Sequence, residues 1–391
     1  MNLLENHLDE LLNEPLESVS SRERNLFNQI AGDQKESMIL FGAGKLGKST
    51  LSRLRTLGIN PLAFADNNMA LWGKQIDGLP VYSPEDIVKT FSRNTSFLVT
   101  IRHPQYTFEH TRRQLLTLGC DKIIPVIALY WKFPEAFLPH YFIDLPHKIL
   151  ESRKEIRQAF LELGDEFSQK EYVAQLYYRL FLNQDLMQEP DHDAQYFPSG
   201  IPMTSQADIF VDCGAYDGDS IRSFLSKTKA KFNHIFAFEP DPKNYSRLSS
   251  YLQQLPSKVR SRITAKCSAL GSRHERLRFH ADGTPESTIS TSEGVDVEVI
   301  TLDDFLYDWI PTYIKMDIEG SEIEALIGAQ QLIQRNKPAL AICVYHQPEH
   351  LWRIPLLLRS LSNEYRLFLR PHDYEGWDLV CYAIPRSRLV T

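Results

Sequence analysis

Residues 209–220 read IFVDCGAYDGDS, a mostly apolar run that passes into a glycine-containing turn. The run predicts a buried strand, and Gly214 and Gly218 predict a tight turn into a helix. Glycine allows the backbone to approach a ligand closely, and the first turn of a helix offers free N–H donors. The turn also holds three acids, Asp212, Asp217 and Asp219. These carboxylates would repel a phosphate, so the turn suits a ligand with a cationic or neutral group.

An acid follows at the end of the next strand-like run. Glu239 comes 25 residues after Gly214 and closes the run at residues 234–238. A carboxylate there can accept two hydrogen bonds from a ribose diol. Turn and acid together predict a nucleoside site, and the acidic turn favours the ammonium and sulfonium groups of S-adenosylmethionine. A tight turn with a solvated acid is the alternative.

Further strand-like runs alternate with helical stretches downstream of this turn. The runs lie at residues 209–213, 234–238, 263–270, 313–316, 339–344, 366–369 and 379–384. Strands that alternate with helices predict a doubly wound α/β domain. Residues 276–300 alternate like a hairpin insertion into that domain.

Five motifs of this region resemble, in order, those of the FkbM-type methyltransferases. They lie at residues 212–220, 237–242, 269–271, 301–305 and 314–322. The resemblance covers about residues 205–385 and implies the class I methyltransferase fold, a Rossmann-like seven-stranded sheet with an antiparallel last strand. It also implies S-adenosylmethionine as cofactor and methylation of a hydroxyl group, often on a sugar or a glycosylated or polyketide-like product.

The resemblance also assigns site residues. It implies that Asp212, Gly214, Ala215 and Gly218 line the methionine end of the cofactor. Glu239 would hold the ribose, and Ala269 would lie near the adenine. The full set expected at the cofactor is Asp212, Gly214, Ala215, Asp217, Gly218, Ser220, Glu239, Pro240, Ala269 and Asp317.

The residues expected to do the chemistry follow two later strands. Asp317 and Glu319 come directly after residues 313–316, and His346 follows the run at 339–345. His346 is the predicted general base for an alcohol acceptor, because histidine titrates near neutrality, and Glu319 is the competing base. The three side chains could also hold a divalent cation, but the sequence does not give their separation, so no metal is assigned.

A second glycine turn lies near the N-terminus. Gly42, Gly44 and Gly47 have the dinucleotide spacing, and Asp66 follows 24 residues after Gly42. About four strands fit before residue 131, so we expect a small Rossmann-like α/β domain at residues 35–130. Residues 64–68 and 73–81 resemble the small domains attached to sugar-modifying transferases, which implies a nucleotide or nucleotide-linked acceptor. Three alternatives remain for this region. The protein could be an NAD-dependent oxidoreductase or a non-catalytic nucleotide-binding protein, or the domain could serve only packing or dimerisation.

Length and composition limit the remaining possibilities. The chain has 391 residues, of which 43% are hydrophobic, and a net charge of −7. Two or three globular domains are expected: an amphipathic helix in residues 1–34, the domain at 35–130, a helical linker at 131–204 and the methyltransferase domain at 205–391. The sequence has no dense block of lysine and arginine, so nucleic-acid binding is not expected. The expected partners are a small-molecule acceptor, such as a sugar or nucleotide sugar, and a second copy of the chain in a homodimer.

Location follows from the same observations. The longest apolar run, residues 123–131, is too short to span a bilayer, and residues 1–21 lack the basic start of a signal peptide. The five cysteines are widely spaced, which favours buried reduced thiols and a cytoplasmic protein. The sequence thus predicts a cytoplasmic O-methyltransferase.

Overall fold

The computed structural model divides the chain into two compact units, which differ from the predicted domains. It describes residues 3–32, 37–91, 95–103, 106–192, 195–205, 207–280, 288–290 and 294–389. One unit contains residues 1–8, 153–176 and 185–391, and the other contains residues 9–152 and 177–184. The segment expected as a linker, residues 131–204, is therefore divided between the two units. Its apolar helix faces pack with one domain or the other, which a composition-based boundary does not show.

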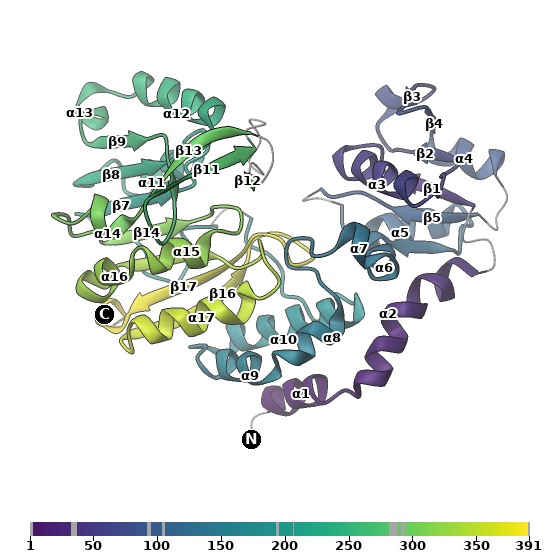
Figure 1. Ribbon diagram of the computed structural model, residues 1–391, viewed down its shortest axis with the longest axis horizontal. Coiled ribbons are helices and arrows are strands. Elements are labelled where there is room, and N and C mark those ends of the chain that lie inside the picture. The colour runs from purple at the N-terminus through teal and green to yellow at the C-terminus, as the bar shows by residue number, and fades with distance from the viewer. Residues whose placement is uncertain are drawn as a thin grey trace. The chain divides into compact units, whose positions relative to one another are not determined.

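The larger unit is built on a seven-stranded sheet (Figure 1). The sheet order is β16-β17-β15-β14-β7-β8-β9, with antiparallel pairing only where β17 meets β15 and β16. The strands are β7 (Ile209–Cys213), β8 (His234–Phe238), β9 (Ile263–Lys266), β14 (Tyr313–Met316), β15 (Ala339–Cys343), β16 (Tyr365–Pro371) and β17 (Leu379–Pro385). The predicted seven-stranded sheet with its antiparallel last strand is confirmed. Strand order reverses between β7 and β14, and ligands of open α/β sheets bind at such a point.

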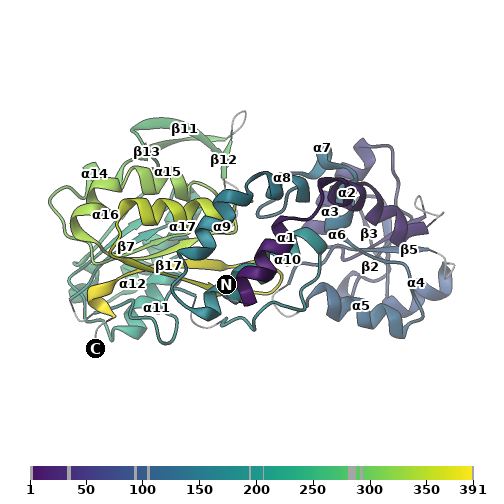
Figure 2. The ribbon, with the colours of Figure 1, turned by 90° about the horizontal axis from the view of Figure 1, so that it is seen from below.

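Helices cover both faces of this sheet (Figure 2). On one side lie α14 (Leu302–Phe305), α15 (Glu322–Ile327), α16 (Gln330–Asn336) and α17 (His350–Leu361), and on the other α11 (Asp219–Lys227) and α12 (Pro242–Gln254). The short α13 (Ser257–Arg260) follows α12, and α9 (Arg153–Leu161) packs against α17. Because both faces are covered, β7, β8, β14 and β15 are almost entirely buried, as parallel strands require.

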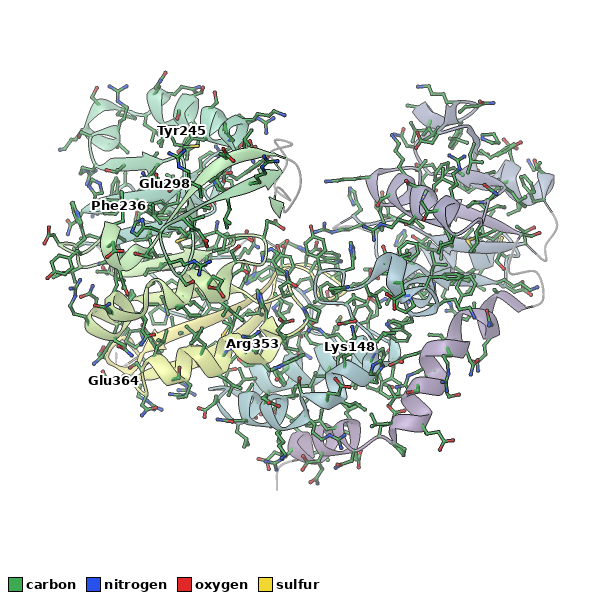
Figure 3. The ribbon with its side chains drawn as sticks, viewed as in Figure 1. Lys148, Phe236, Tyr245, Glu298, Arg353 and Glu364 are labelled. Carbon is green, nitrogen blue, oxygen red and sulfur yellow. The ribbon has the colours of Figure 1, made fainter. Side chains whose placement is uncertain are left out.

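The run at 263–270 does not form one strand. It breaks after β9, and β10 (Ala269–Leu270) joins a four-stranded sheet with β13 (Val295–Ile300), β11 (Glu275–His280) and β12 (Thr288–Ser290). The predicted hairpin insertion is thus three strands, although residues 281–287 and 291–293 lie outside the described part. An ion pair of 2.8 Å between Lys266 and Glu298, which is labelled in Figure 3, joins β9 to β13. Tyr245, also labelled there, donates its hydroxyl from α12 to the Ala265 carbonyl of β9 at 3.3 Å.

The smaller unit has a six-stranded sheet in the order β3-β4-β2-β1-β5-β6. Its strands are β1 (Met38–Phe41), β2 (Ala63–Ala65), β3 (Gln75–Ile76), β4 (Leu79–Tyr82), β5 (Ser96–Val99) and β6 (Ile123–Pro125). The expectation of about four strands was wrong, because it did not include β3 and β4, which are short and lie on either side of a turn at Gly78. In this sheet β1 pairs in parallel with β2 and β5, β2 with β4, and β5 with β6, whereas β3 pairs with β4 antiparallel.

Alternate residues of β1 face two separate cores. Met38 and Leu40 pack with α2 (Leu16–Ala31) and α3 (Lys45–Thr56), whereas Ile39 and Phe41 pack with α4 (Pro84–Thr90) and α5 (Phe108–Thr117). The remaining helices of this part are α6 (Val126–Lys132), α7 (Pro134–Phe137) and α8 (Pro146–Glu151). Two helices, α1 (Leu3–Leu12) and α10 (Glu166–Phe181), have residues in both units.

Two further expectations concern membrane spans and thiols. Within the described residues, no helix has the length and apolar character needed to cross a bilayer. All five cysteines are free and four are buried, but Cys267 is exposed, which corrects the expectation that every thiol is buried. Cys267 lies in the short segment between β9 and β10, where the chain leaves the main sheet.

Candidate active site

The turn after β7 is held against the loop after β14. Gly214 has φ = 81°, and a Cβ atom there would lie 1.9 Å from the carbonyl oxygen of Asp317. The N–H groups of Gly214 and Ala215 donate to the Phe238 carbonyl at 3.0 and 2.9 Å. Glycine is therefore required here for contact between two loops of the protein. The approach of a ligand to Gly214 stays a prediction.

Asp212 and Ser220 belong to a buried network under the turn. Lys315 lies 3.2 Å from an Asp212 carboxylate oxygen, and Ser220 donates its hydroxyl to the same side chain at 2.5 Å. Lys315 also donates to the Gly214 carbonyl at 2.6 Å. Burial alone would lower the pKa of Lys315, but Asp212 outweighs burial and raises it above its usual range, whereas burial raises the pKa of Asp212 in spite of Lys315. These contacts hold the turn in shape, and both predicted cofactor residues are fully enclosed.

Sequence reasoning missed Lys315, although a signal was present. A lysine in the middle of the apolar run Tyr313–Met316 must be buried if the run is a central strand. Buried lysines are almost always paired. The only way to name its partner, however, was to know that β14 pairs with β7, which places Lys315 opposite Asp212.

The second half of the turn starts α11. Gly218 has φ = 92°, and a Cβ atom there would lie 2.6 Å from the Tyr251 ring. Asp217 forms a partly exposed ion pair of 2.5 Å with Arg222. Gly218 therefore has a packing role, and Asp217 lies at the surface of the turn.

Glu239 stands beside the turn at the end of β8. Its carboxylate accepts the N–H groups of Tyr216 and Asp241, both at 2.9 Å, and the residue is 5% exposed. Burial raises the pKa of Glu239 to about 7, although the two backbone donors act in the opposite direction. A buried carboxylate that the backbone holds in one orientation is placed to accept further donors, as its predicted role requires.

Pro240 and Ala269 lie near the same edge of the sheet. The Cys267 thiol donates a hydrogen bond to the Pro240 carbonyl at 3.8 Å, which links the segments that follow β8 and β9. Ala269 is half-buried, but it belongs to β10 of the small sheet. Next to it, Ser268 is fully buried, and its hydroxyl has no hydrogen-bond partner among the described residues. Ser268 was not predicted, because a lone serine after a strand is not distinctive in sequence.

The predicted catalytic residues come together at the ends of β14 and β15. His346 Nε2 lies 3.3 Å from an Asp317 oxygen and 3.8 Å from a Glu319 oxygen. On the other side of the ring, His346 Nδ1 lies 2.7 Å from Glu322. The histidine is buried, whereas the side chains of Asp317 and Glu319 are 25% and 16% exposed. One histidine thus stands among three carboxylates.

This arrangement sets the charge of the histidine. Burial alone would lower the pKa of His346, but the carboxylates, Glu322 foremost, raise it to about 10. Burial would likewise raise the pKa of Glu322, but His346 outweighs burial and lowers it to about 2. An imidazolium cannot accept a proton, so this environment does not suit the predicted role of His346 as a base near neutral pH.

Two residues that were not predicted organise this cluster. Glu322 accepts the N–H groups of Ile318 and Gly320 at 2.9 and 3.1 Å, which fixes the loop that carries Glu319. Tyr196 donates its hydroxyl to Asp317 at 2.7 Å. Glu322 lies within the motif at residues 314–322, but only the conformation of the loop shows that its side chain faces His346. Tyr196 is more than 100 residues from its partner, and no local pattern identifies it.

The turn in the smaller unit has a similar construction. Gly42 has φ = 118°, and a Cβ atom at Gly47 would lie 2.0 Å from the Gly42 carbonyl oxygen. Asp66 accepts the N–H groups of Ala43 and Asn68, both at 2.7 Å. By contrast, a Cβ atom at Gly44 would meet none of the described residues within 4 Å. Gly42 and Gly47 are needed for packing, and Gly44 is open with respect to the described part of the chain.

Comparison with known proteins agrees with this geometry. Residues 212–375 match the family model described as methyltransferase FkbM domain. Hexuronic acid methyltransferase AglP of Haloferax volcanii is 28% identical over 172 residues, which is 43% of this chain and 69% of that protein. The crystal structure of methyltransferase FkbM from Methylobacillus flagellatus has a TM-score of 0.76 and 25% identity, and the match covers 97% of this chain and 98% of that one. The family model thus spans the chain from Asp212, in the last turnward part of β7, to Glu375, in the loop after β16.

Proposed function

We propose that the protein is an S-adenosylmethionine-dependent methyltransferase that methylates a hydroxyl group of a sugar or glycosylated small molecule. The observation that carries the proposal is the placement of Glu239 beside the Gly214 turn, at the reversal of strand order in a methyltransferase domain. A ribose diol would donate to the Glu239 carboxylate. The Ser268 hydroxyl, buried without a partner in the described part of the chain, would face the adenine end.

The residues after β14 and β15 supply the chemistry expected on the acceptor side. S-Adenosylmethionine carries a methyl group on a positively charged sulfur, so the protein must chiefly align the acceptor oxygen with it. The C–O bond forms as the C–S bond breaks, the electron pair stays on sulfur, and the hydroxyl proton must leave. We propose Glu319 as the proton acceptor. His346, whose Nε2 faces both carboxylates, orients Glu319 and Asp317.

Two observations favour a sugar as the acceptor. The relative from Haloferax volcanii is named as a hexuronic acid methyltransferase. In addition, the half-buried Trp377 lies in the loop between β16 and β17, with its ring centroid 6.1 Å from that of Tyr345. Because β17 runs antiparallel to β15, this loop lies at the same edge as His346. An indole face there offers an apolar surface for a sugar ring.

The first prediction concerns cofactor affinity. Glu239→Ala is expected to weaken S-adenosylmethionine binding by about 1.5–3 kcal/mol, the usual scale of a hydrogen bond to a charged group. Calorimetric titration at a pH above 8, where the wild-type carboxylate is ionised, measures the change. Glu298→Ala, which removes an exposed carboxylate of the small sheet, should bind like wild type. Unchanged affinity in a folded Glu239→Ala protein would exclude the assignment.

The N-terminal turn supports a second candidate function, the binding of a nucleotide or nucleotide-linked acceptor. The first turn of α3 contains Lys45 and Lys48 and no acid, in contrast to the acidic turn before α11. A positively charged helix start with an open Gly44 suits a phosphate group. The match of nearly the whole chain to a methyltransferase FkbM structure favours an accessory module of a methyltransferase over an NAD-dependent oxidoreductase or a non-catalytic nucleotide-binding protein.

Gly44→Val tests this candidate with little risk to the fold, because Gly44 has φ = −76° and a Cβ atom there contacts no described residue within 4 Å. We expect UDP-glucose binding by the full chain to be lost while S-adenosylmethionine binding and thermal stability persist. NAD, titrated in parallel, separates the oxidoreductase alternative. If the wild-type chain binds neither UDP-sugars nor NAD, the N-terminal unit serves packing or dimerisation.

A further inference from the structure

The cluster at the ends of β14 and β15 has the composition and spacing of a cation site. Asp317, Glu319 and His346 each offer one ligand atom, and these atoms lie within 4.8 Å of one another. The two measured separations, 3.3 and 3.8 Å from His346 Nε2, are close to those between neighbouring ligands of an ion bound at about 2.1–2.3 Å. A small adjustment of the Glu319 side chain would therefore bring all three atoms to one ion.

Residues outside the cluster orient two of the three ligands. Glu322 lies 2.7 Å from Nδ1 of His346, which directs Nε2 toward Asp317 and Glu319. Tyr196 donates to Oδ2 of Asp317 at 2.7 Å, and Oδ1 is the oxygen that faces His346. A carboxylate on the far side of a ligating imidazole and a hydrogen bond to a ligating carboxylate are typical outer-shell contacts of metal sites.

The charge balance also favours a cation. Three carboxylates, Asp317, Glu319 and Glu322, face His346, and a second imidazole, His350, lies 3.4 Å from Glu322. His346 would bind the ion as a neutral imidazole, so it would offset none of this negative charge. The excess is costly in a partly buried site, and a divalent ion would offset it. The exposed fractions of Asp317 and Glu319 leave a side open to solvent and to an acceptor.

We propose that Asp317, Glu319 and His346 bind a divalent cation of the Mn²⁺ or Mg²⁺ class, whose open positions take a hydroxyl oxygen of the acceptor. Two carboxylates suit these hard ions, and one imidazole is better matched to Mn²⁺. This inference rests on the proposed function. The ion would lower the pKa of the coordinated hydroxyl, whose proton passes to the second carboxylate oxygen of Glu319 as the oxygen bonds to the methyl carbon and sulfur keeps the electron pair.

The test is titration of the chelator-treated full chain with Mn²⁺ alone, with free Mn²⁺ followed by electron paramagnetic resonance. One saturable Mn²⁺ per chain is expected. Asp317→Asn should abolish binding, and Tyr196→Phe, which removes only the orienting hydroxyl, should weaken it roughly 10- to 100-fold. Because Tyr196→Phe keeps the ring, it remains informative if Asp317→Asn does not fold.

A matched control comes from the small sheet and its neighbourhood. His274 and Asp304 form an exposed histidine–carboxylate pair of 2.9 Å, and Asp304→Asn should leave Mn²⁺ binding unchanged. Absence of saturable Mn²⁺ binding, or binding that Asp317→Asn and Tyr196→Phe leave intact, would overturn the cation site. S-Adenosylmethionine titration of the same chelator-treated protein separates the two proposals. If the protein binds S-adenosylmethionine but not Mn²⁺, only the cation site is excluded. If it binds Mn²⁺ but not S-adenosylmethionine, only the proposed function is excluded.

Discussion

Lys315→Met is expected to destabilise the C-terminal unit by about 3–5 kcal/mol, because it leaves the Asp212 carboxylate buried without its counter-ion. Asp212 is fully buried, and Lys315 is 2% exposed. Methionine preserves the length and apolar stem of lysine, so the lost free energy of unfolding is due to removal of the charge and not to a cavity. Denaturant unfolding followed by tryptophan fluorescence measures the change. The same variant should lose S-adenosylmethionine binding, since Lys315 also holds the Gly214 carbonyl.

A double variant separates charge from shape in this network. Lys315→Met combined with Asp212→Asn should recover part of the lost stability, because the amide oxygen can still accept the Ser220 hydroxyl. Asp217→Asn, which removes the partly exposed pair with Arg222, is the matched control and should cost no more than about 1 kcal/mol. A Lys315→Met protein as stable as wild type would show that the buried ion pair does not hold the turn.

The second large effect is expected for Gly214→Ala. The added Cβ atom would lie 1.9 Å from the Asp317 carbonyl oxygen, and the residue would also have to keep φ = 81°. No side-chain rotation relieves a Cβ contact with backbone, so the loops after β7 and β14 must separate. We expect a loss of several kcal/mol or failure of this unit to fold, together with loss of cofactor binding. Thermal unfolding and S-adenosylmethionine titration are the measurements.

Gly200→Ala is the control for backbone conformation alone. Gly200 lies in the same unit and has φ = 79°, and a Cβ atom there would contact nothing within 4 Å among the residues that the structure describes. Its variant should therefore show only the cost of a positive φ, about 1–2 kcal/mol. Equal losses in the two variants would contradict the role assigned to the contact between Gly214 and Asp317.

Periodicity predicted the strands next to the site well. The runs at 209–213, 234–238 and 313–316 have the same bounds as β7, β8 and β14. These strands are buried on both faces, so their runs are mostly apolar, and Gly214, Glu239 and Asp317 directly follow them. The run at 263–270 was divided between two sheets, because residues 267–268 leave the main sheet. Which sheet a strand joins depends on the strands that lie beside it, and these cannot be identified from local sequence.

The candidate site was predictable at the level of which loops form it. In a parallel sheet the carboxyl ends of neighbouring strands meet at one edge, so Glu239, Glu319 and His346 could be assigned to a common edge from strand order alone. Their individual contacts were not predictable. Gly214 contacts the Asp317 carbonyl and Asp212 pairs with Lys315, and neither contact follows from local sequence.

The sequence alone determined the α/β class of both units, the acidic glycine turn and the order of motifs that resembles FkbM methyltransferases. These features are local, since they follow from apolar periodicity and from residue types at short spacing. Only the tertiary structure decided that Tyr196 orients Asp317, that Glu322 holds His346, and that the Asp317, Glu319 and His346 ligand atoms meet within 4.8 Å. The physical reason is that hydrogen bonds and metal coordination depend on ångström-scale separations between segments that only strand pairing and burial bring together.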